Sequence, residues 1–441
     1  MHAPEFGNPT GAICNDCHCS DRHGALDRLF SLAFSPLLNM GFLNALLGRK
    51  PSPDAFAALF IEAAHHRGFD ASLNYNADEF RLEYSDHAVF NLHHAYRAYC
   101  GSDKASRETA IEGFVATLCA SHRAAPEQLS EAHAMLRPLI RGRGVLEDVR
   151  LHQLRTAGRA TSFASAWQPF GDDCAILLAL DYPESTSTLM SGPVESWGIA
   201  LDDALAIARD NLRDITTDAF VEVARGVYRG DWHDGYDASR ALLPDLLHRA
   251  PVHGVPVFMI PTRDVLLVTS DKDDGGIARM LELSREAALT GRPVSPFMYC
   301  YHEGLRRFSP RQVHVARRLA QLALRYRKED YDSQKTALDR LHKQEGCDVF
   351  VANYLLYGTK DDAGEMFSAA TWTAGIESLL PLADRVVLVR PETGETRIVS
   401  WQQIAPLVGS LLEEEPMYPV RYRTRGFPDA GQFSSFARSE S

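Results

Sequence analysis

The chain has 441 residues, of which 45% are hydrophobic and 24% are charged, and its formal net charge is −12. This composition is typical of a soluble globular protein, and the length predicts two or three domains instead of a single core. The negative charge argues against a protein whose whole surface binds nucleic acid, so we do not expect a nucleic-acid partner.

The first residues contain a group of cysteines and histidines. Cys14 and Cys17 have the C-x2-C spacing that can bind one tetrahedral zinc ion, and Cys19 or His23 would complete such a site. Zinc or copper(I) binding is one interpretation and redox sensing is another, but we favour a flexible tail with incidental thiols. Haem attachment is not expected, because the N-terminus lacks the features of a secretion signal. The other five of the eight cysteines are scattered singly, which favours a reducing cytoplasm over a disulfide framework.

Residues 29–47 form a stretch of nineteen residues without a charge. A stretch of that length could just span a bilayer. Against spanning, it contains Pro36, Asn39 and Asn44, and an amide is costly in hydrocarbon. We expect an apolar helical segment packed on the main body, and membrane spanning and surface membrane association remain as alternatives.

Residues 51–136 predict a compact α-β-β-α-α unit. Its first helix has Ser52 as a side-chain cap and Pro53 in the first turn, where the missing N–H costs nothing. The expected elements are a helix from Ser52 to Gly68, a hairpin between Phe69 and Tyr84, and helices at Leu92–Cys100 and Arg107–Cys119.

A second α+β unit is expected at residues 137–305, after a polar stretch of arginines at 137–143. Its expected elements are strands at Ile176–Leu180 and Phe220–Val227, and helices at Leu201–Leu212, Ala238–His248 and Ile277–Leu289. A basic helix, Arg311–Arg327, then links it to a C-terminal α+β unit at 331–428, before a tail at 429–441. The mixed order of strands and helices predicts an α+β fold, with mixed or antiparallel sheets and flanking helices.

The segment Val257–Ser270 predicts a central β-hairpin. Two wholly apolar runs flank a short polar tip, and strands that are apolar on both sides are buried on both faces. Arg263 and Asp264 at the tip are charged, so the core is expected to hold them at a fixed place on the surface. This tip is the best indication of a site in the sequence.

Three places in the middle of the chain resemble the YtpQ family of bacterial cytosolic proteins, whose function is unassigned. They are Asn91-Leu92 with Ala95-Tyr96-Arg97 and Tyr99, Ser196-Trp197-Gly198 before Leu201 and Asn211-Leu212, and Ile260-Pro261-Thr262-Arg263-Asp264 before Leu266-Leu267-Val268. Thr262 stands where the family pattern has asparagine. The resemblance covers roughly residues 51–301, and it implies a fold and a cytosolic location but no chemistry.

Two further groups of charged residues have two interpretations each. Three acids and a histidine between Asp231 and Asp237 are close enough to bind a divalent cation, but we favour a turn at Asp234-Gly235 with Asp237 capping the next helix. Arginines and a histidine recur between Arg307 and Arg325, and arginines alternate from Arg421 to Arg425. Both patterns suit an acidic partner, RNA or anionic lipid, but we favour pairing with the chain's own acids, such as those at 413–415.

No nucleophile elbow, P-loop or zinc-protease motif is present in the sequence. The function we favour is therefore non-catalytic binding or scaffolding by a cytoplasmic protein. Its expected surface is the Arg263–Asp264 tip with the loop that contains Asp234, Asp237 and Arg240. One alternative is a hydrolase-like enzyme whose site is assembled from dispersed residues around the tip, and another is a metal- or redox-responsive protein that uses Cys14, Cys17 and Cys19. No cofactor is expected, with zinc at the N-terminal cysteines as the alternative, and the protein or small-molecule partner is not identified by the sequence.

Overall fold

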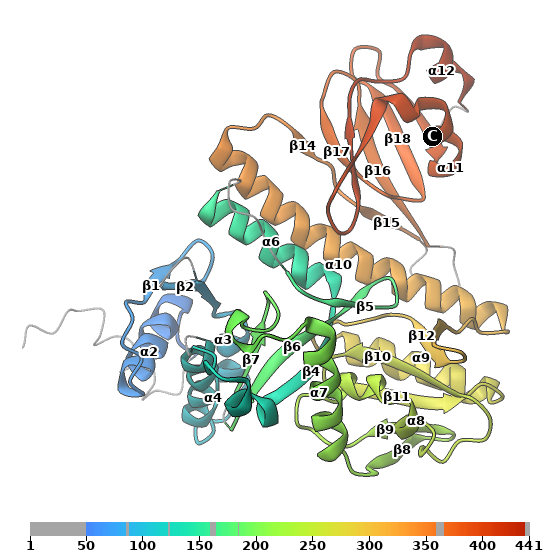
Figure 1. Cartoon of the computed structure of the whole chain (residues 1–441). Coiled ribbons are helices and arrows are strands. Elements are labelled where there is room, and N and C mark those ends of the chain that lie inside the picture. Colours follow the sequence, from blue (N-terminus) through green and yellow to red (C-terminus); the bar gives the residue numbers. More distant parts are fainter. Residues whose placement is uncertain are drawn as a thin grey trace, which may run out of the picture.

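The computed structural model describes residues 50–84, 88–121, 124–158, 165–183, 185–358 and 366–436. The protein is α+β, with several mixed and antiparallel sheets and flanking helices, as the sequence predicts. Figure 1 shows the N-terminal elements beside a larger central body, with the helix α10 (Val313–Glu345) lying across that body and the C-terminal unit beyond the helix.

The first unit matches its predicted order, with one strand added. It contains α2 (Pro53–His66), β1 (Asn74–Asn76), β2 (Arg81–Tyr84), β3 (Ala88–Asn91), α3 (His93–Gly101) and α4 (Arg107–Ser121). Ser52 caps α2 by accepting a hydrogen bond from the Ala55 N–H at 3.2 Å, and Gly68 follows the helix at φ +89°. The core is aromatic, and Phe56 packs against Tyr96 and Tyr99 with ring centroids 5.3 Å apart in both pairs.

The central body contains two sheets and the helices that cover them. Its elements are β4 (Leu136–Gly142), α6 (Arg143–Ala157), β5 (Gln168–Phe170), β6 (Cys174–Tyr182), β7 (Ser185–Leu189), α7 (Leu201–Asp214), β8 (Phe220–Ala224), β9 (Val227–Gly230), β10 (Pro256–Thr262), β11 (Val265–Ser270), α9 (Asp274–Ala288), β12 (Met298–Tyr301) and β13 (Leu305–Arg307). In one sheet β6 pairs with β4, β5 and β7, and the other has the order β13-β12-β10-β11-β9-β8.

The predicted central hairpin is confirmed. β10 and β11 pair antiparallel at the middle of the six-stranded sheet, and every residue of β10 is buried. Phe258 and Ile260 face a core shared with β6, while Val257 and Met259 face a second core with α9 and α10. Successive residues of a strand point to opposite faces, so two covered faces require the unbroken apolar run seen in the sequence.

The stretch at 137–143, interpreted from its arginines as a polar start to the second unit, is instead the buried strand β4. It pairs with β6 along its whole length, from Leu136 opposite Leu180 to Gly142 opposite Cys174. Arg137 is tolerated inside because its guanidinium donates to the carbonyls of Ala134 and Leu136, each at 2.9 Å. The sequence pattern was misleading because composition does not reveal what compensates a buried arginine, here the two carbonyls and the Asp181 carboxylate 3.7 Å from Arg137 Nε.

Two predicted helices have different bounds in the structure. The helix expected at 238–248 is split into a 3-10 turn, Ala238–Leu242, and a short helix α8 (Pro244–Leu247), because Pro244 lacks an N–H. The helix expected at 311–327 begins later, at Val313, and runs to Glu345, where Gly346 ends it in the left-handed region. Arg307 and Arg311 therefore lie before α10, and the basic residues that recur between Arg307 and Arg325 do not all belong to one helix.

The C-terminal unit contains two four-stranded sheets, with orders β15-β16-β18-β19 and β14-β17-β21-β20. Its elements are β14 (Phe350–Val351), β15 (Leu355–Tyr357), β16 (Phe367–Thr373), β17 (Ser378–Pro381), β18 (Arg385–Arg390), β19 (Glu395–Ser400), α11 (Trp401–Val408), β20 (Leu412–Glu415), β21 (Arg421–Thr424) and α12 (Ala430–Ser435). The turn after Arg390 joins β18 and β19, which pair antiparallel from Arg385 opposite Ser400 to Arg390 opposite Glu395.

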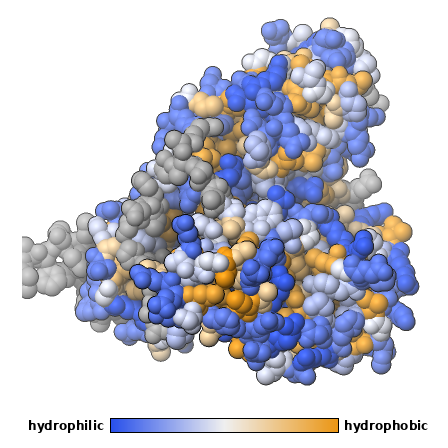
Figure 2. Space-filling model, viewed as in Figure 1, coloured by the Kyte–Doolittle hydropathy of each residue, from blue (hydrophilic) through white to orange (hydrophobic). Residues whose placement is uncertain are grey.

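Among the described residues, no helix combines the length and apolarity that crossing a bilayer requires. On the face shown in Figure 2, hydrophobic residues occur in patches among hydrophilic ones. The apolar stretch at 29–47 lies outside the described residues.

Candidate functional site

The hairpin tip is held by backbone hydrogen bonds from two other segments. The Arg263 N–H donates to the Arg292 carbonyl at 3.2 Å, and the Arg263 carbonyl accepts from the Ala238 N–H at 3.2 Å. Arg263 is half-buried and Asp264 is exposed. The core therefore fixes the position of both residues, as the sequence predicts.

Two further arginines join Arg263 at the tip, and together we call them the arginine corner: Arg141, Arg263 and Arg292. The end of β4 is tied to the tip because the Ile140 N–H donates to Ser239 Oγ at 3.2 Å, next to the Ala238 that binds Arg263. Arg292 comes from the segment after α9. Their guanidinium groups are close enough that each acts electrostatically on at least one of the others.

The arginine corner holds more positive charge than its neighbours neutralise. Burial lowers the pKa of Arg263 to about 9, with further lowering by Arg141 and Arg292, while Asp264 raises it. Burial likewise lowers the pKa of Arg141 to about 10, with Asp264 opposing and Arg292 adding to the effect. Among the described residues, none of the three arginines has an acid within ion-pair distance, and Arg263 Nε is buried without a hydrogen bond.

An exposed fourth arginine lies at the edge of this group. Burial lowers the pKa of Arg292, Asp264 raises it, and Arg97 of α3 lowers it again. Arg97 and Arg263 belong to two of the sequence segments that carry the YtpQ resemblance, so the fold brings those segments near one another. The sequence does not indicate Arg141 or Arg292 as site residues, because Arg141 belongs to the stretch expected as a polar start to the second unit and Arg292 lies in a loop without a pattern.

The loop at 234–240 was expected to share this surface, but Arg240 is fully buried. Its guanidinium forms two hydrogen bonds with the Asp234 carboxylate, at 2.7 and 2.6 Å, a third with Thr216 at 2.9 Å, and lies 4.4 Å from the Trp232 ring centroid. Burial opposes ionisation of Asp234, but the Arg240 hydrogen bonds hold its pKa below the usual value. Arg240 is thus a structural residue, and the prediction that it binds a partner is wrong.

Asp237 is also fully buried, which contradicts its expected place on a binding surface. The predicted turn is confirmed, since the Tyr236 N–H donates to Asp234 Oδ1 at 3.0 Å and Gly235 has φ +80°. The predicted cap is wrong, because Asp237 makes no capping bond and accepts instead from the His233 N–H at 3.3 Å. Burial raises its pKa, and its Oδ2 atom has no hydrogen-bond partner.

The predicted metal ligands Cys14, Cys17, Cys19 and His23 lie outside the described residues, so their role stays a prediction. Within the part of the chain that the structure describes, no three histidine, cysteine or acidic side chains are grouped to hold a metal ion. The cation interpretation of the loop at 231–237 therefore has no support there. The Asp231 carboxylate is paired with His233 Nε2 at 2.7 Å instead.

A separate cleft lies where the central body, α10 and the C-terminal loop at 414–420 meet, with a volume of about 400 Å³. Among the acids that line it are Asp173 and Asp330, which the sequence did not indicate. Asp173 accepts hydrogen bonds from Tyr299 at 2.6 Å and from Ser295 at 2.7 Å. Asp330 lies against Gly144 of α6, where a Cβ would be 2.2 Å from Asp330 Oδ1, so only glycine leaves room for this carboxyl group.

Asp330 is the most strongly perturbed acid of this cleft. Burial raises its pKa to about 7, and the nearby acids Asp148, Glu329 and Asp173 raise it further against the opposing effect of Arg327. No hydrogen bond or ion pair to this carboxyl group is found among the described residues. A carboxyl group that titrates near neutral pH in a cleft is suited to general acid–base chemistry.

We expect Asp330→Asn to become stabilising relative to wild type as the pH rises from about 4 to 8. The folded protein binds this proton more tightly than the unfolded chain, whose pKa is near 3.8, so wild-type stability falls as pH rises through that range. Thermal unfolding at successive pH values measures the difference. Asp332→Asn, which removes a charge from the exposed side of the same helix, provides the baseline, and parallel curves for both variants would contradict the assignment.

No family model matches the chain, and neither a curated protein nor a solved structure matches it. The arginine corner and the cleft are therefore interpreted from their own geometry.

Proposed function

We propose that this protein binds an anionic group, a phosphoryl or carboxylate group of a small molecule or partner protein, at the arginine corner. The binding function expected from the sequence thus keeps the Arg263–Asp264 tip and replaces the loop at 234–240 with Arg141 and Arg292. A cytoplasmic location is part of the proposal, and the free thiols of the five described cysteines support it.

One observation carries the proposal: three arginines from three separate segments converge on a single exposed carboxylate. Bringing like charges together in a partly buried place is unfavourable, and surrounding acids usually neutralise them. An anion would supply the missing charge and acceptors for the unpaired guanidinium N–H groups. Arginine suits this role because its planar N–H groups match the oxygens of phosphate and carboxylate.

We expect wild-type protein to bind pyrophosphate, and Arg263→Gln or Arg292→Gln to weaken that binding by about tenfold or more, since each removes charge-assisted hydrogen bonds. Without the anion, Arg292→Gln should not lower the melting temperature, because it relieves repulsion. Isothermal titration calorimetry and thermal unfolding measure the two effects, and citrate in place of pyrophosphate separates carboxylate from phosphoryl recognition.

The control is Arg213→Gln, which removes an exposed arginine of α7 that is paired with Asp210 at 2.9 Å. It should leave pyrophosphate binding unchanged. If wild-type protein binds neither anion, or if the control weakens binding as much as the corner variants do, the proposal is wrong.

If the protein is an enzyme, its active site would lie elsewhere than at the hairpin tip, where the sequence places it. Arg263 is not among the residues that line the Asp173–Asp330 cleft, so an acid–base enzyme would use the cleft and not the tip. Catalysis there stays a prediction, and a neutral-range titration of Asp330 is its first requirement. A metal- or redox-responsive function of the N-terminal cysteines likewise stays a prediction.

A further inference from the structure

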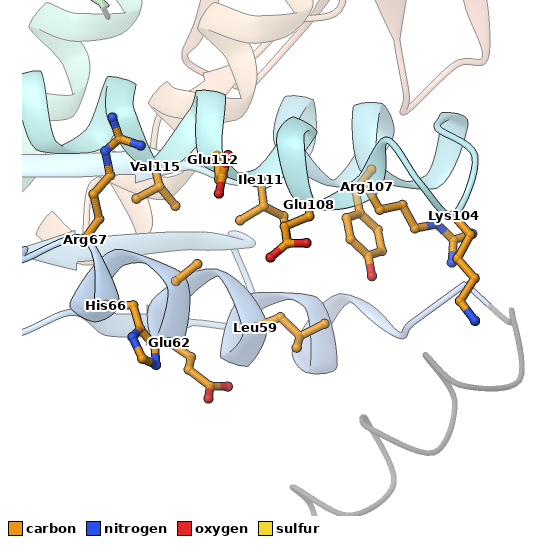
Figure 3. Close-up of a pocket in the computed structure, with 12 residues that line it drawn as sticks. Leu59, Glu62, His66, Arg67, Lys104, Arg107, Glu108, Ile111, Glu112 and Val115 are labelled. Carbon is orange, nitrogen blue, oxygen red and sulfur yellow. The ribbon is translucent and has the colours of Figure 1, made fainter.

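A groove with an apolar floor runs between α2 and α4, with a volume of about 620 Å³. Leu59 and Ala63 of α2 lie along one side, and Ile111 and Val115 of α4 lie along the other. Figure 3 shows the side chains of Leu59, Ile111 and Val115 pointing into the space between the two helices. Its rim carries charges of both signs, from the acids Glu62, Glu108 and Glu112 and the bases Arg67, Lys104 and Arg107.

On each side of the groove the apolar side chains are spaced as on a helix surface against which another helix packs. Leu59 and Ala63 are four residues apart, as are Ile111 and Val115, so each pair forms a ridge on one face of its helix. The α2 face that packs into the core of this unit is a different one, which contains the buried Phe56 and Phe60. Leu59 and Ile111 are only half-buried; Ile111 also packs against that core, whereas Leu59 does not belong to it.

We propose that this groove is the docking site of residues 29–47 of the same chain, which lie outside the described residues. The described chain begins at Lys50, and Pro51 is buried, with its carbonyl accepting a hydrogen bond from the Tyr96 hydroxyl at 2.8 Å. Tyr99 lies three residues further along the same helix and lines the groove. The apolar stretch therefore ends within a few residues of the groove.

The stretch is apolar like the floor of the groove, and it is long enough to cover that floor. It has no charge between Leu29 and Leu47, which suits the apolar floor of the groove. Pro36 divides it, and the eleven residues that follow would span about 16 Å as a helix, against about 10 Å along α2 from Leu59 to His66.

Tethering favours this occupant over a membrane or a second copy of the chain. A short connection gives the segment an effective concentration in the millimolar range, well above that of a separate protein in solution. Docking also removes the apolar surface of the groove and that of the segment from water in one step.

The test uses limited chymotrypsin digestion of the full chain, with mass spectrometry to follow cleavage after Phe34 and Phe42. A docked segment is cleaved slowly, and Ile111→Lys should speed cleavage by about tenfold, since cleavage follows the population of the released state. Thr109→Lys is the matched control, because Thr109 is exposed on the same helix and does not line the groove. It should leave the rate unchanged.

A second variant covers the case in which Ile111→Lys does not fold. Phe42→Lys changes the segment and leaves the described body intact, and it should speed hydrogen exchange in peptides that contain Leu59 or Ile111. Equal cleavage in wild type and Ile111→Lys overturns the proposal. So does flotation of the wild-type chain with vesicles of phosphatidylcholine and phosphatidylglycerol, or a dimer in light scattering that Ile111→Lys dissociates. None of these outcomes depends on anion binding at the arginine corner.

Discussion

Replacing Arg421 with methionine should lower the free energy of unfolding by about 3–5 kcal/mol, because it leaves several buried acceptors without a donor, at about 1–3 kcal/mol each. Arg421 is fully buried in β21 and has no carboxylate partner among the described residues. Its guanidinium donates to Gln334 Oε1 at 2.5 Å and to the carbonyls of Ala352 and Leu379 at 2.8 and 3.0 Å. Methionine would fill much of the space but leave these buried acceptors unpaired.

The matched control for Arg421 is two residues further along the same strand. Arg423 pairs with Glu377 at 2.6 Å near the surface, so Arg423→Met should cost less than about 1 kcal/mol. Urea unfolding followed by the fluorescence of Trp372 and Trp401, both in this unit, measures the two changes. Similar losses for both variants would show that the buried network does not stabilise the unit.

The second large effect is expected at Arg240, where substitution by methionine should cost about 3 kcal/mol. The change removes both hydrogen bonds to Asp234 and leaves that carboxylate partly buried beside Asp237. Because the pKa of Asp234 is held below its ordinary value of 3.8, the pair stabilises the fold above that pH, and its contribution is lost as the pH falls through the folded pKa. The difference between wild type and variant should therefore shrink in acid.

A double-mutant cycle tests whether Asp234 is the reason for this loss. Arg240→Met combined with Asp234→Asn should cost less than the sum of the two single changes, since no uncompensated charge remains. Arg249→Met, at an exposed arginine paired with Asp218 at 3.0 Å, is the control and should change stability little. Strict additivity in the cycle would contradict a direct interaction between Arg240 and Asp234.

The arginines of this chain show where sequence interpretation ends. Arg421, Arg423 and Arg425 occupy every second position from β21 into the residues just after it, yet the first is buried, the second pairs with Glu377, and the third pairs with Glu413. The predicted pairing with the acids at 413–415 is thus confirmed for Arg425 and wrong for Arg421. The alternating pattern of arginines does not tell which of them is buried and which pairs with an acid, because the nearest acceptors come from distant parts of the chain.

The sequence by itself determined the elements whose signals are local. The double-sided apolar runs of the hairpin at 257–270, the Ser52 cap of α2 and the stripe of α7 each depend on neighbours within a few residues, and all three are present. Only the tertiary structure decided which charged residues meet. Arg141 is more than a hundred residues from Arg263 and Arg292 in the sequence, and Asp173 is equally far from Asp330. The packing of strands and helices sets the burial and the partners of these residues. Burial and long-range electrostatics are properties of that packing, so no local pattern encodes them.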